Sequence, residues 1–459
     1  MSTLGPSTSQ PLPTDAWAAV SRDTATSSEA RPGWLQRWLL RFFWLYCLGF
    51  MFPFPLEVLT ELVNAKWVAQ AFNWQAALKD QVIRYVGEQW LHVEIVIQPT
   101  GSGDTMRNYV SCLILAVASW GLSLVWMVLD YRGRMDRFLH HSLRVLLRFF
   151  LAVVLFQYGI FKVFPLQFPL PSLSRLEQPL GQFSPMGLLW TFMGFSPVFC
   201  CFTGLAECVG GLLLTTRRTT LLGALILIAV MSVIVMMNLC FDVPVKLYSM
   251  HYLGMAFLLV IPDLRRLLRF FILGQPAPAP SEFYIRKPRW VNPVLVTLRT
   301  LVVLGFFGMV SFSAWSMYQE VQSYPLFYGS WKVTQFRWDH QEVTGDAMPE
   351  KPGIKKWTQV MVNRGGLTII RLAGPAQEAP QLRFRITADE QTTSLTLTHL
   401  MDPEKKITFQ YQRPHPKEWH LQGTWEGKPL EVRLQLNDAM NTLLLTRDFH
   451  WIQELPFNR

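Results

Sequence analysis

Residues 197–239 read PVFCCFTGLAECVGGLLLTTRRTTLLGALILIAVMSVIVMMNL. Two long apolar runs flank a short turn that carries Arg217 and Arg218. A helix of about 20 residues rises about 30 Å, which is the thickness of the hydrocarbon core of a bilayer. The stretch therefore predicts two membrane-spanning helices joined by a basic turn.

Similar apolar runs recur from residue 38 to residue 315, so the sequence predicts a polytopic α-helical membrane protein with seven transmembrane helices. Half of the residues are hydrophobic and 16% are charged, against roughly 25% charged in soluble domains. This composition excludes a mainly soluble, disordered or collagen-like chain. The predicted spans are Trp38–Leu59, Tyr109–Leu129, Leu146–Phe164, Pro197–Leu214, Leu221–Leu239, Met250–Ile261 and Val294–Trp315.

The net charge of +10 follows the loops of this topology. Lys and Arg are concentrated before the first span and in every second loop after it, for example at Arg132, Arg134 and Arg137. Because cytoplasmic loops are rich in these residues, we expect a cytoplasmic N-terminus and an extracytoplasmic C-terminus in a bacterial inner membrane. The basic charge then indicates topology and contact with membrane lipid, and no nucleic-acid partner is expected.

The chain divides into five parts by composition. Residues 1–33 are rich in Ser, Thr, Pro and Ala and are expected to form a disordered cytoplasmic tail. Residues 34–273 form a membrane domain of six helices, 274–293 a cytoplasmic linker that contains Pro and Ala, and 294–317 the seventh helix. Residues 325–459 contain no run that could span a membrane and are expected outside the cytoplasm.

The last part shows the period-two alternation of β-strands. It predicts an antiparallel meander of about eight or nine strands, of which Thr442–Thr446 is the last. A meander of this length hides its edges by closing into a barrel or by stacking as a sandwich, and the pattern leaves both open. Gly329-Ser330-Trp331 resembles the Gly-x-Trp start of lipocalin-type barrels.

Glu207 is the clearest candidate for a functional residue in the membrane. It lies ten residues into its span, and an ionised carboxylate at the centre of a bilayer costs about 3 kcal/mol. One interpretation is a carboxyl group that holds helices together, aided by the small residues Gly204, Gly210 and Gly211. The other is a carboxyl group that handles protons or binds a ligand.

Further polar residues lie toward the outer ends of the neighbouring spans. Tyr158 and Lys162 are four residues apart on one helix face, and Lys162 either reaches the membrane interface or pairs with Glu207 or Asp242. The turn between the fifth and sixth spans is either a solvated loop or part of a polar pocket. We predict one outward-facing ligand site from Tyr158, Lys162, Glu207, Asn238, Asp242, Lys246 and His251.

Residues 184–194 (SPMGLLWTFMG) are too short to span a membrane and predict an interfacial or re-entrant helix over this site, with Ser184 as its N-cap. Cys200, Cys201 and Cys240 lie near the same outer ends and are candidates for a disulfide or a redox role. The cysteines show no CxxC or zinc spacing, so no metal site is predicted. Catalytic residues stay unknown.

The third and fourth spans resemble the DoxX-like membrane family, in which an Arg and a Gly-x-x-Lys precede a Gly-x-x-Glu on the next helix. Here these motifs are Arg148, Gly159-Ile-Phe-Lys162 and Gly204-Leu-Ala-Glu207. The resemblance covers about residues 144–272 and implies a four-helix unit, with more distant similarity to vitamin K carboxylase-like and lipase-maturation-factor membrane domains. The chain departs from the short DoxX pattern by an insertion at 165–196, by additional helices and by the β domain.

The resemblance implies a membrane component of redox or envelope metabolism, without deciding whether it is an enzyme. Tyr, His and carboxyl groups near an interface can hydrogen-bond quinone oxygens, so a quinone or another lipid-soluble ligand is the leading expectation, with a redox partner for its electrons. The alternative is a non-enzymatic scaffold or maturation factor whose β domain binds a secreted client protein or a lipid. No nucleophile with a base is evident in that domain.

Overall fold

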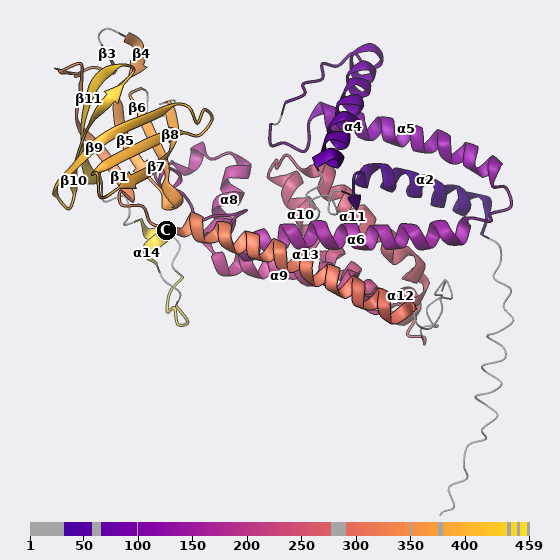
Figure 1. Ribbon diagram of the computed structural model, residues 1–459. Helices are drawn as coiled ribbons and strands as arrows, with labels where there is room; N and C mark the ends of the chain where they lie inside the picture. The colour runs from indigo at the N-terminus through magenta and orange to yellow at the C-terminus, as the bar shows by residue number, and fades with distance from the viewer. Residues whose placement is uncertain are drawn as a thin grey trace, which may run out of the picture. The chain divides into compact units, whose positions relative to one another are not determined.

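The computed structural model contains two compact units, which are drawn in Figure 1. It describes residues 32–56, 66–98, 100–276, 291–348, 351–374, 380–437, 442–447 and 450–456. The first unit comprises residues 1–91 and 110–144, and the second comprises residues 92–109 and 145–459. The expected disordered tail and most of the expected linker at 274–293 lie outside the described residues.

The first unit is helical. Its long helices are α2 (Trp34–Met51), α4 (Lys66–Tyr85), most of α5 (Met106–Leu129) and the start of α6 (Asp136–Val163). α2 runs alongside α5. The two helices approach closely at Gly49, where an added Cβ would lie 2.5 Å from a methyl carbon of Leu115. The first turn of α2 lies beside the end of α5, since Arg37 donates to the Asp130 carbonyl oxygen at 2.8 Å and pairs with Asp136, the first residue of α6. α2 is therefore antiparallel to α5.

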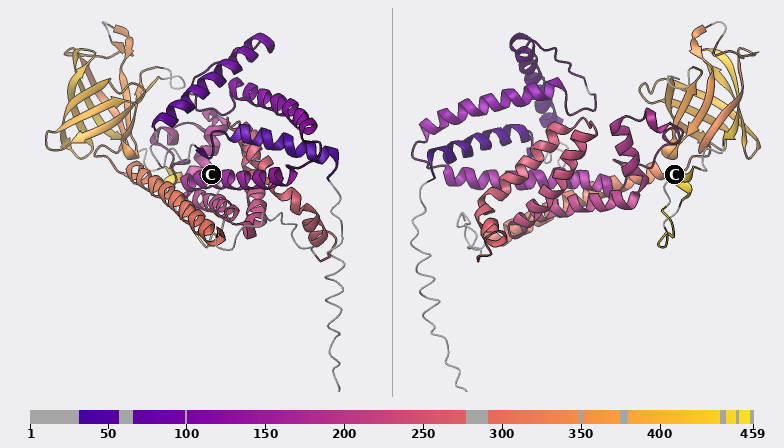
Figure 2. Two further views of the ribbon diagram at one scale, coloured as in Figure 1. Left: turned by 45° about the vertical axis from the view of Figure 1, so that its right-hand side comes forward. Right: turned by 180° about the vertical axis from the view of Figure 1, so that it is seen from behind.

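The second unit contains the rest of α6 and the helices that follow it. α9, α10 and α11 pack in sequence order, and Figure 2 shows the ribbon from two further directions. The remaining helices are α7 (Leu173–Leu176), α8 (Pro185–Phe195), α9 (Pro197–Leu214), α10 (Thr220–Cys240), α11 (Lys246–Val260), α12 (Leu264–Phe271) and α13 (Val291–Gln322). Ser184 accepts a hydrogen bond from the Gly187 amide, so the predicted cap and short helix at α8 are confirmed.

Among the described residues, six helices are long and apolar enough to cross a membrane, one fewer than the sequence predicts. The first predicted run, Trp38–Leu59, is where the two differ. It forms α2, which begins earlier and ends at Met51, just before Pro53. Two arginines in its first half lower its hydropathy. The six are Met106–Leu129, Asp136–Val163, Pro197–Leu214, Arg217–Cys240, Lys246–Phe271 and Val296–Gln322.

The C-terminal part is an eight-stranded antiparallel barrel, and the choice between barrel and sandwich is thereby resolved. Strands β5 to β11 form a meander, β1 pairs with β5, and β1 also pairs with β11, which closes the sheet. Two short strands, β3 (Ala347–Met348) and β4 (Lys351–Lys355), form a separate hairpin, and β2 (Gln341–Glu342) extends β1. The barrel strands are β1 (Gly329–Trp338), β5 (Trp357–Val362), β6 (Leu367–Leu372), β7 (Gln381–Asp389), β8 (Ser394–His399), β9 (Lys406–His415), β10 (Glu418–Trp425) and β11 (Lys428–Asn437).

The inward side chains of the strands fill the barrel with one hydrophobic core. Trp357 is fully buried and its ring lies 6.0 Å from the ring of Phe409. Trp331 of the Gly-x-Trp sequence donates its indole N–H to the Phe327 carbonyl at 2.7 Å, which fixes the start of β1. Aromatic side chains thus occupy the space that a wider barrel would offer to a ligand.

The predicted ninth strand at Thr442–Thr446 is wrong. Leu443–Thr446 form the short helix α14 instead. Because β11 has already paired with β1, the sheet has no open edge on which a further strand could add. The alternating Leu and Thr residues therefore do not form a strand here.

Candidate functional site

The site is built on the crossing of α6 and α9. A Cβ at Gly204 would lie 2.5 Å from the Gly159 carbonyl oxygen, and a Cβ at Gly159 would lie 2.7 Å from the Gly204 carbonyl oxygen. Such distances are below any real Cβ contact, so only glycine lets the two backbones approach this closely. Small residues serve the same purpose at many helix crossings in membranes.

One turn along each helix from this crossing, Lys162 donates a hydrogen bond to Oε1 of Glu207. The side chain of Lys162 is 7% exposed and that of Glu207 is 1% exposed. The structure thus pairs Lys162 with one of the two carboxylates expected from the sequence. Oε2 of Glu207 is buried and has no hydrogen-bond partner among the described residues.

Arg148 makes a second polar contact between the same helices. Its Nε donates to the Leu214 carbonyl oxygen at 2.8 Å, although the residue is only 5% exposed. Leu214 ends α9, so the guanidinium satisfies a carbonyl that lacks an intrahelical partner and lies at the negative end of the helix dipole. The three motif positions Arg148, Lys162 and Glu207 therefore all join α6 to α9.

Tyr158 and the cysteines lie around this pair in different environments. Tyr158 is 44% exposed and lies close to Glu207 and Tyr248. Cys200 is fully buried, in a small cluster with Phe168 of the insertion, whereas Cys240 is exposed on α10. All six cysteines have free thiols in the structure.

The other predicted ligand-binding residues form a hydrogen-bonded turn at the start of α11. Lys246 Nζ lies 2.9 Å from an Asp242 oxygen and 3.7 Å from an Asp104 oxygen. Asn238 donates to Ser249 Oγ at 3.0 Å, and His251 Nδ1 lies 2.7 Å from the Leu247 carbonyl oxygen. Asp242 is 84% exposed. These contacts give the turn a structural role, and none of them is a contact with Lys162 or Glu207.

Asp104 was not expected from the sequence. Its two carboxylate oxygens accept the amide protons of Lys246 and Leu247, each at 2.9 Å. A carboxylate at this place caps α11 and complements the positive end of its dipole. The partners are more than 140 residues apart in the chain, so no local pattern reveals the cap.

The insertion between α6 and α9 contacts the outer wall of the barrel, which is a second feature that the sequence did not predict. Leu173 and Leu176 of α7 pack on Met361 and Ile369. The Leu173 amide donates to Oδ1 of Asn363 at 2.9 Å. Strand alternation places Met361 and Ile369 outside while Val360, Val362 and Ile370 enter the core. α7 therefore covers an apolar patch on β5 and β6.

Glu177 follows α7 and provides the polar part of the same contact. Its carboxylate accepts hydrogen bonds from Ser330 Oγ at 2.9 Å and from Gln359 Nε2 at 2.7 Å, and Arg371 Nη1 lies 3.4 Å away. Gln359 Nε2 also donates to Ser330 Oγ, and its Oε1 accepts from Arg371. One carboxylate is thus held by side chains from three adjacent strands, β1, β5 and β6. We call Glu177, Ser330, Gln359 and Arg371 the Glu177 network.

The β5–β6 turn forms the other attachment of the barrel, at the end of α13. Gly365 donates its amide to the Ser323 carbonyl at 2.8 Å, and Arg364 donates to the Gln322 side chain at 2.8 Å. Gly365 has a φ of +67°, and a Cβ there would lie 3.1 Å from the Val321 Cα. Only glycine fits both the backbone conformation and the close approach.

The comparisons with known proteins agree with the motifs on α6 and α9. A family model described as DoxX matches residues 143–239, which include Arg148, Gly159, Lys162, Gly204 and Glu207. The uncharacterized protein YwoB of Bacillus subtilis (strain 168) is 33% identical over 139 residues, which cover 30% of this chain and 88% of the relative. No solved structure gives a significant match to the chain.

The match with YwoB extends over nearly the whole relative at an identity that indicates common descent, and the family model covers the helices that hold the Lys162–Glu207 pair. The chain belongs to the DoxX family.

Proposed function

We propose that the chain is a multi-pass protein of the bacterial inner membrane with a cytoplasmic N-terminus and an extracytoplasmic barrel, in which α2 makes a seventh crossing beside the six long apolar helices. The distribution of Lys and Arg between the loops supports this orientation. Arg37 and Arg41 of α2 pair with Asp130 and Asp136 in a basic loop, so the start of α2 shares the side of that loop. Reporter fusions after residues 142 and 325 test it, since they should read cytoplasmic and extracytoplasmic. The same compartment for both would refute the topology.

We further propose that the protein is a non-enzymatic scaffold, in which the DoxX unit holds the barrel at the membrane surface for a client protein of the envelope. The observation that carries this proposal is the Glu177 network. An insertion absent from the short DoxX pattern uses an apolar patch and a partly buried carboxylate to bind the barrel wall. A second attachment at Gly365 restricts the barrel further.

The interior of the barrel is filled by aromatic and aliphatic side chains, so the proposed client binds to its outer surface or its loops. A photo-cross-linking amino acid at Met401, Thr387 or Glu418, which are all exposed, tests this in intact cells. The scaffold predicts an adduct with one defined polypeptide and a severalfold smaller yield when Glu177→Ala is added. Adducts with lipid alone, or none at any of these positions, would contradict it.

A second candidate function is the binding of a lipid-soluble ligand such as a quinone beside Lys162 and Glu207, with a redox partner. The observation that favours it is the Glu207 Oε2 atom, which is buried without a hydrogen-bond partner among the described residues. A quinol hydroxyl could donate to this oxygen, and Tyr158, one turn before Lys162 on α6, is 44% exposed.

Mass spectrometry of lipids that co-purify with the protein in detergent distinguishes the two candidates. The ligand hypothesis predicts a quinone at near-stoichiometric amount in the wild type and its loss in Glu207→Gln. Cys240→Ser is a control, because that thiol is exposed on α10. Reproducible absence of quinone from the wild type would exclude the second candidate and leave the scaffold proposal unaffected.

A further inference from the structure

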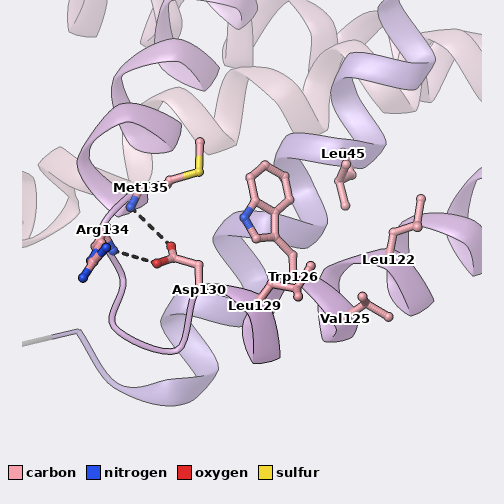
Figure 3. Close-up of a pocket in the computed structure, with 8 residues that line it drawn as sticks. All are labelled: Leu45, Leu122, Val125, Trp126, Leu129, Asp130, Arg134 and Met135. Atoms are coloured by element: carbon pink, nitrogen blue, oxygen red, sulfur yellow. Dashed lines mark hydrogen bonds between the residues drawn. The ribbon is translucent and has the colours of Figure 1, made fainter.

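The first unit contains an apolar hollow between α2 and α5 that ends at a basic loop. Figure 3 shows the hollow, with a volume of about 550 Å³ and a mouth open to the surface. Its walls are apolar side chains, and its polar end is the loop that joins α5 to α6. The lining residues are Leu45, Leu122, Val125, Trp126, Leu129, Asp130, Arg134 and Met135.

The carboxylates beside the hollow are already neutralised. Arg41 is fully buried and its Nη2 lies 2.8 Å from an Asp130 oxygen and 2.7 Å from an Asp136 oxygen. Arg37 Nε lies 3.0 Å from the other oxygen of Asp136. The Asp130 oxygens also accept the amide protons of Arg134 and Met135, as the dashed lines in Figure 3 mark. Two arginines of α2 thus balance the two aspartates of the loop.

Three further arginines of the same loop region, Arg132, Arg134 and Arg137, are exposed. Across the part of the chain that the structure describes, none of the three forms an ion pair with a carboxylate. The polar end of the hollow therefore carries uncompensated positive charge. Arg134 is itself one of the residues that line the hollow.

The walls of the hollow are fixed before any ligand binds. The Trp126 ring packs edge-on against the Trp44 ring with centroids 5.6 Å apart, and Trp44 donates to Ser142 Oγ at 2.9 Å. The loop is fixed by the ion pairs of Asp130 and Asp136 with Arg37 and Arg41. A site that needs no reordering loses less free energy on binding than a mobile one.

We propose that this hollow binds one anionic phospholipid, with an acyl chain along Leu122, Val125 and Trp126 and the phosphate on Arg134. An acyl chain matches the apolar walls, and a net negative headgroup matches the arginines that form no ion pair with a carboxylate among the described residues. Basic pockets between transmembrane helices bind anionic headgroups elsewhere for the same physical reason. A zwitterionic lipid also matches the apolar walls, but its neutral headgroup gains little from the positive charge of the arginines.

Native mass spectrometry of the full-length protein tests the proposal, with phosphatidylglycerol and phosphatidylethanolamine of identical acyl chains as probes. We expect one phosphatidylglycerol to bind preferentially. Arg134→Gln should weaken phosphatidylglycerol binding about fivefold, which is the effect of one basic residue near a charged surface. The triple variant with Arg132→Gln and Arg137→Gln should weaken it about a hundredfold, because three such residues are lost. Arg217→Gln with Arg218→Gln is the control, because it removes charge from another basic turn.

Val125→Trp tests the apolar part, since it fills the hollow without changing charge. It should weaken both lipids severalfold, whereas Val128→Trp, which lies on the same helix outside the lining, should leave both unchanged. Thermal unfolding of each variant establishes that it is folded. Equal binding of the two lipids by the wild type, or wild-type affinity in the triple arginine variant, would overturn the proposal.

Discussion

Glu207 and Lys162 illustrate why an ion pair inside a membrane is held by its surroundings and not by its charges alone. Removal of water from both groups costs several kcal/mol each, and their attraction repays this only while both are present. Gly159 and Gly204 bring the helices close enough for the two side chains to meet. The pair therefore fixes one specific packing of α6 on α9.

Replacing one partner should cost more than replacing both. Lys162→Met leaves an unpaired carboxylate and should lower the free energy of unfolding by about 3–5 kcal/mol, and Glu207→Leu should do the same through the unpaired ammonium. The double variant should recover most of the loss. Titration with SDS in mixed micelles measures all four proteins, and additive losses in the double variant would disprove the coupling.

Asp130 should make the first unit sensitive to acid. Burial raises the pKa of this carboxyl group, but the amide protons of Arg134 and Met135 and the Arg41 guanidinium outweigh that effect and hold the pKa below its ordinary value. A carboxyl group with a lowered pKa in the folded state stabilises the protein above the pKa of the unfolded chain, about 3.9. That stabilisation is lost as the pH falls through the folded-state pKa.

The melting temperature of the wild type should therefore exceed that of Asp130→Asn at pH 7. The difference should shrink as the pH is lowered from about 5 toward the folded-state pKa. Asp402→Asn is a matched control, because Asp402 forms an exposed pair with Lys405 that contributes little. A difference that stays constant over this range would show that ionised Asp130 does not stabilise the fold.

The crossing of α6 and α9 depends on the absence of side chains at two glycines. Gly204→Ala should destabilise the protein by about 1–3 kcal/mol, because its Cβ would collide with the Gly159 backbone and force the helices apart. Gly254→Ala in α11 is the control, since nothing lies within 4 Å of the added Cβ. Titration with SDS should show a lower free energy of unfolding for Gly204→Ala alone. Equal effects would mean that the close approach is unimportant.

Local patterns in the sequence predicted most of the elements. Apolar runs predicted the long helices of the membrane part except α4, and period-two alternation predicted the strands of the barrel. The prediction failed where the outcome depends on distant partners. Arg37 and Arg41 shorten the apolar part of α2 but are balanced by Asp130 and Asp136. Thr442–Thr446 has strand character but no open edge to join.

The candidate site was also predicted only in part, because some of its contacts join residues that lie far apart in the chain. The sequence left Lys162 either to reach the membrane interface or to pair with Glu207 or Asp242, and the structure pairs it with Glu207. Asp242 and Lys246 were expected in the same pocket but contact Asp104 and each other. The sequence did not indicate Asp104 and Glu177, because each accepts hydrogen bonds from residues more than 140 positions away.

At the scale of the whole molecule, the insertion in the DoxX unit fastens the barrel to the membrane domain. The contact combines an apolar patch with one carboxylate that three strands share. Without the insertion, the described attachments between helices and barrel would be those of the end of α13, to the β5–β6 turn and to Arg385 of β7. The Glu177 network should therefore control how firmly the barrel is held.

Hydrogen exchange of the Leu173 amide in the full-length protein tests this claim most directly, because that N–H donates to Asn363 across the contact. The peptide at 172–178 should be protected in the wild type and exchange roughly tenfold faster or more in Glu177→Ala, as expected for loss of hydrogen bonds to a charged group. Gln178→Ala, whose side chain bonds only within its own segment, should exchange like the wild type. An unprotected peptide in the wild type, or equal protection in Glu177→Ala, would contradict the account.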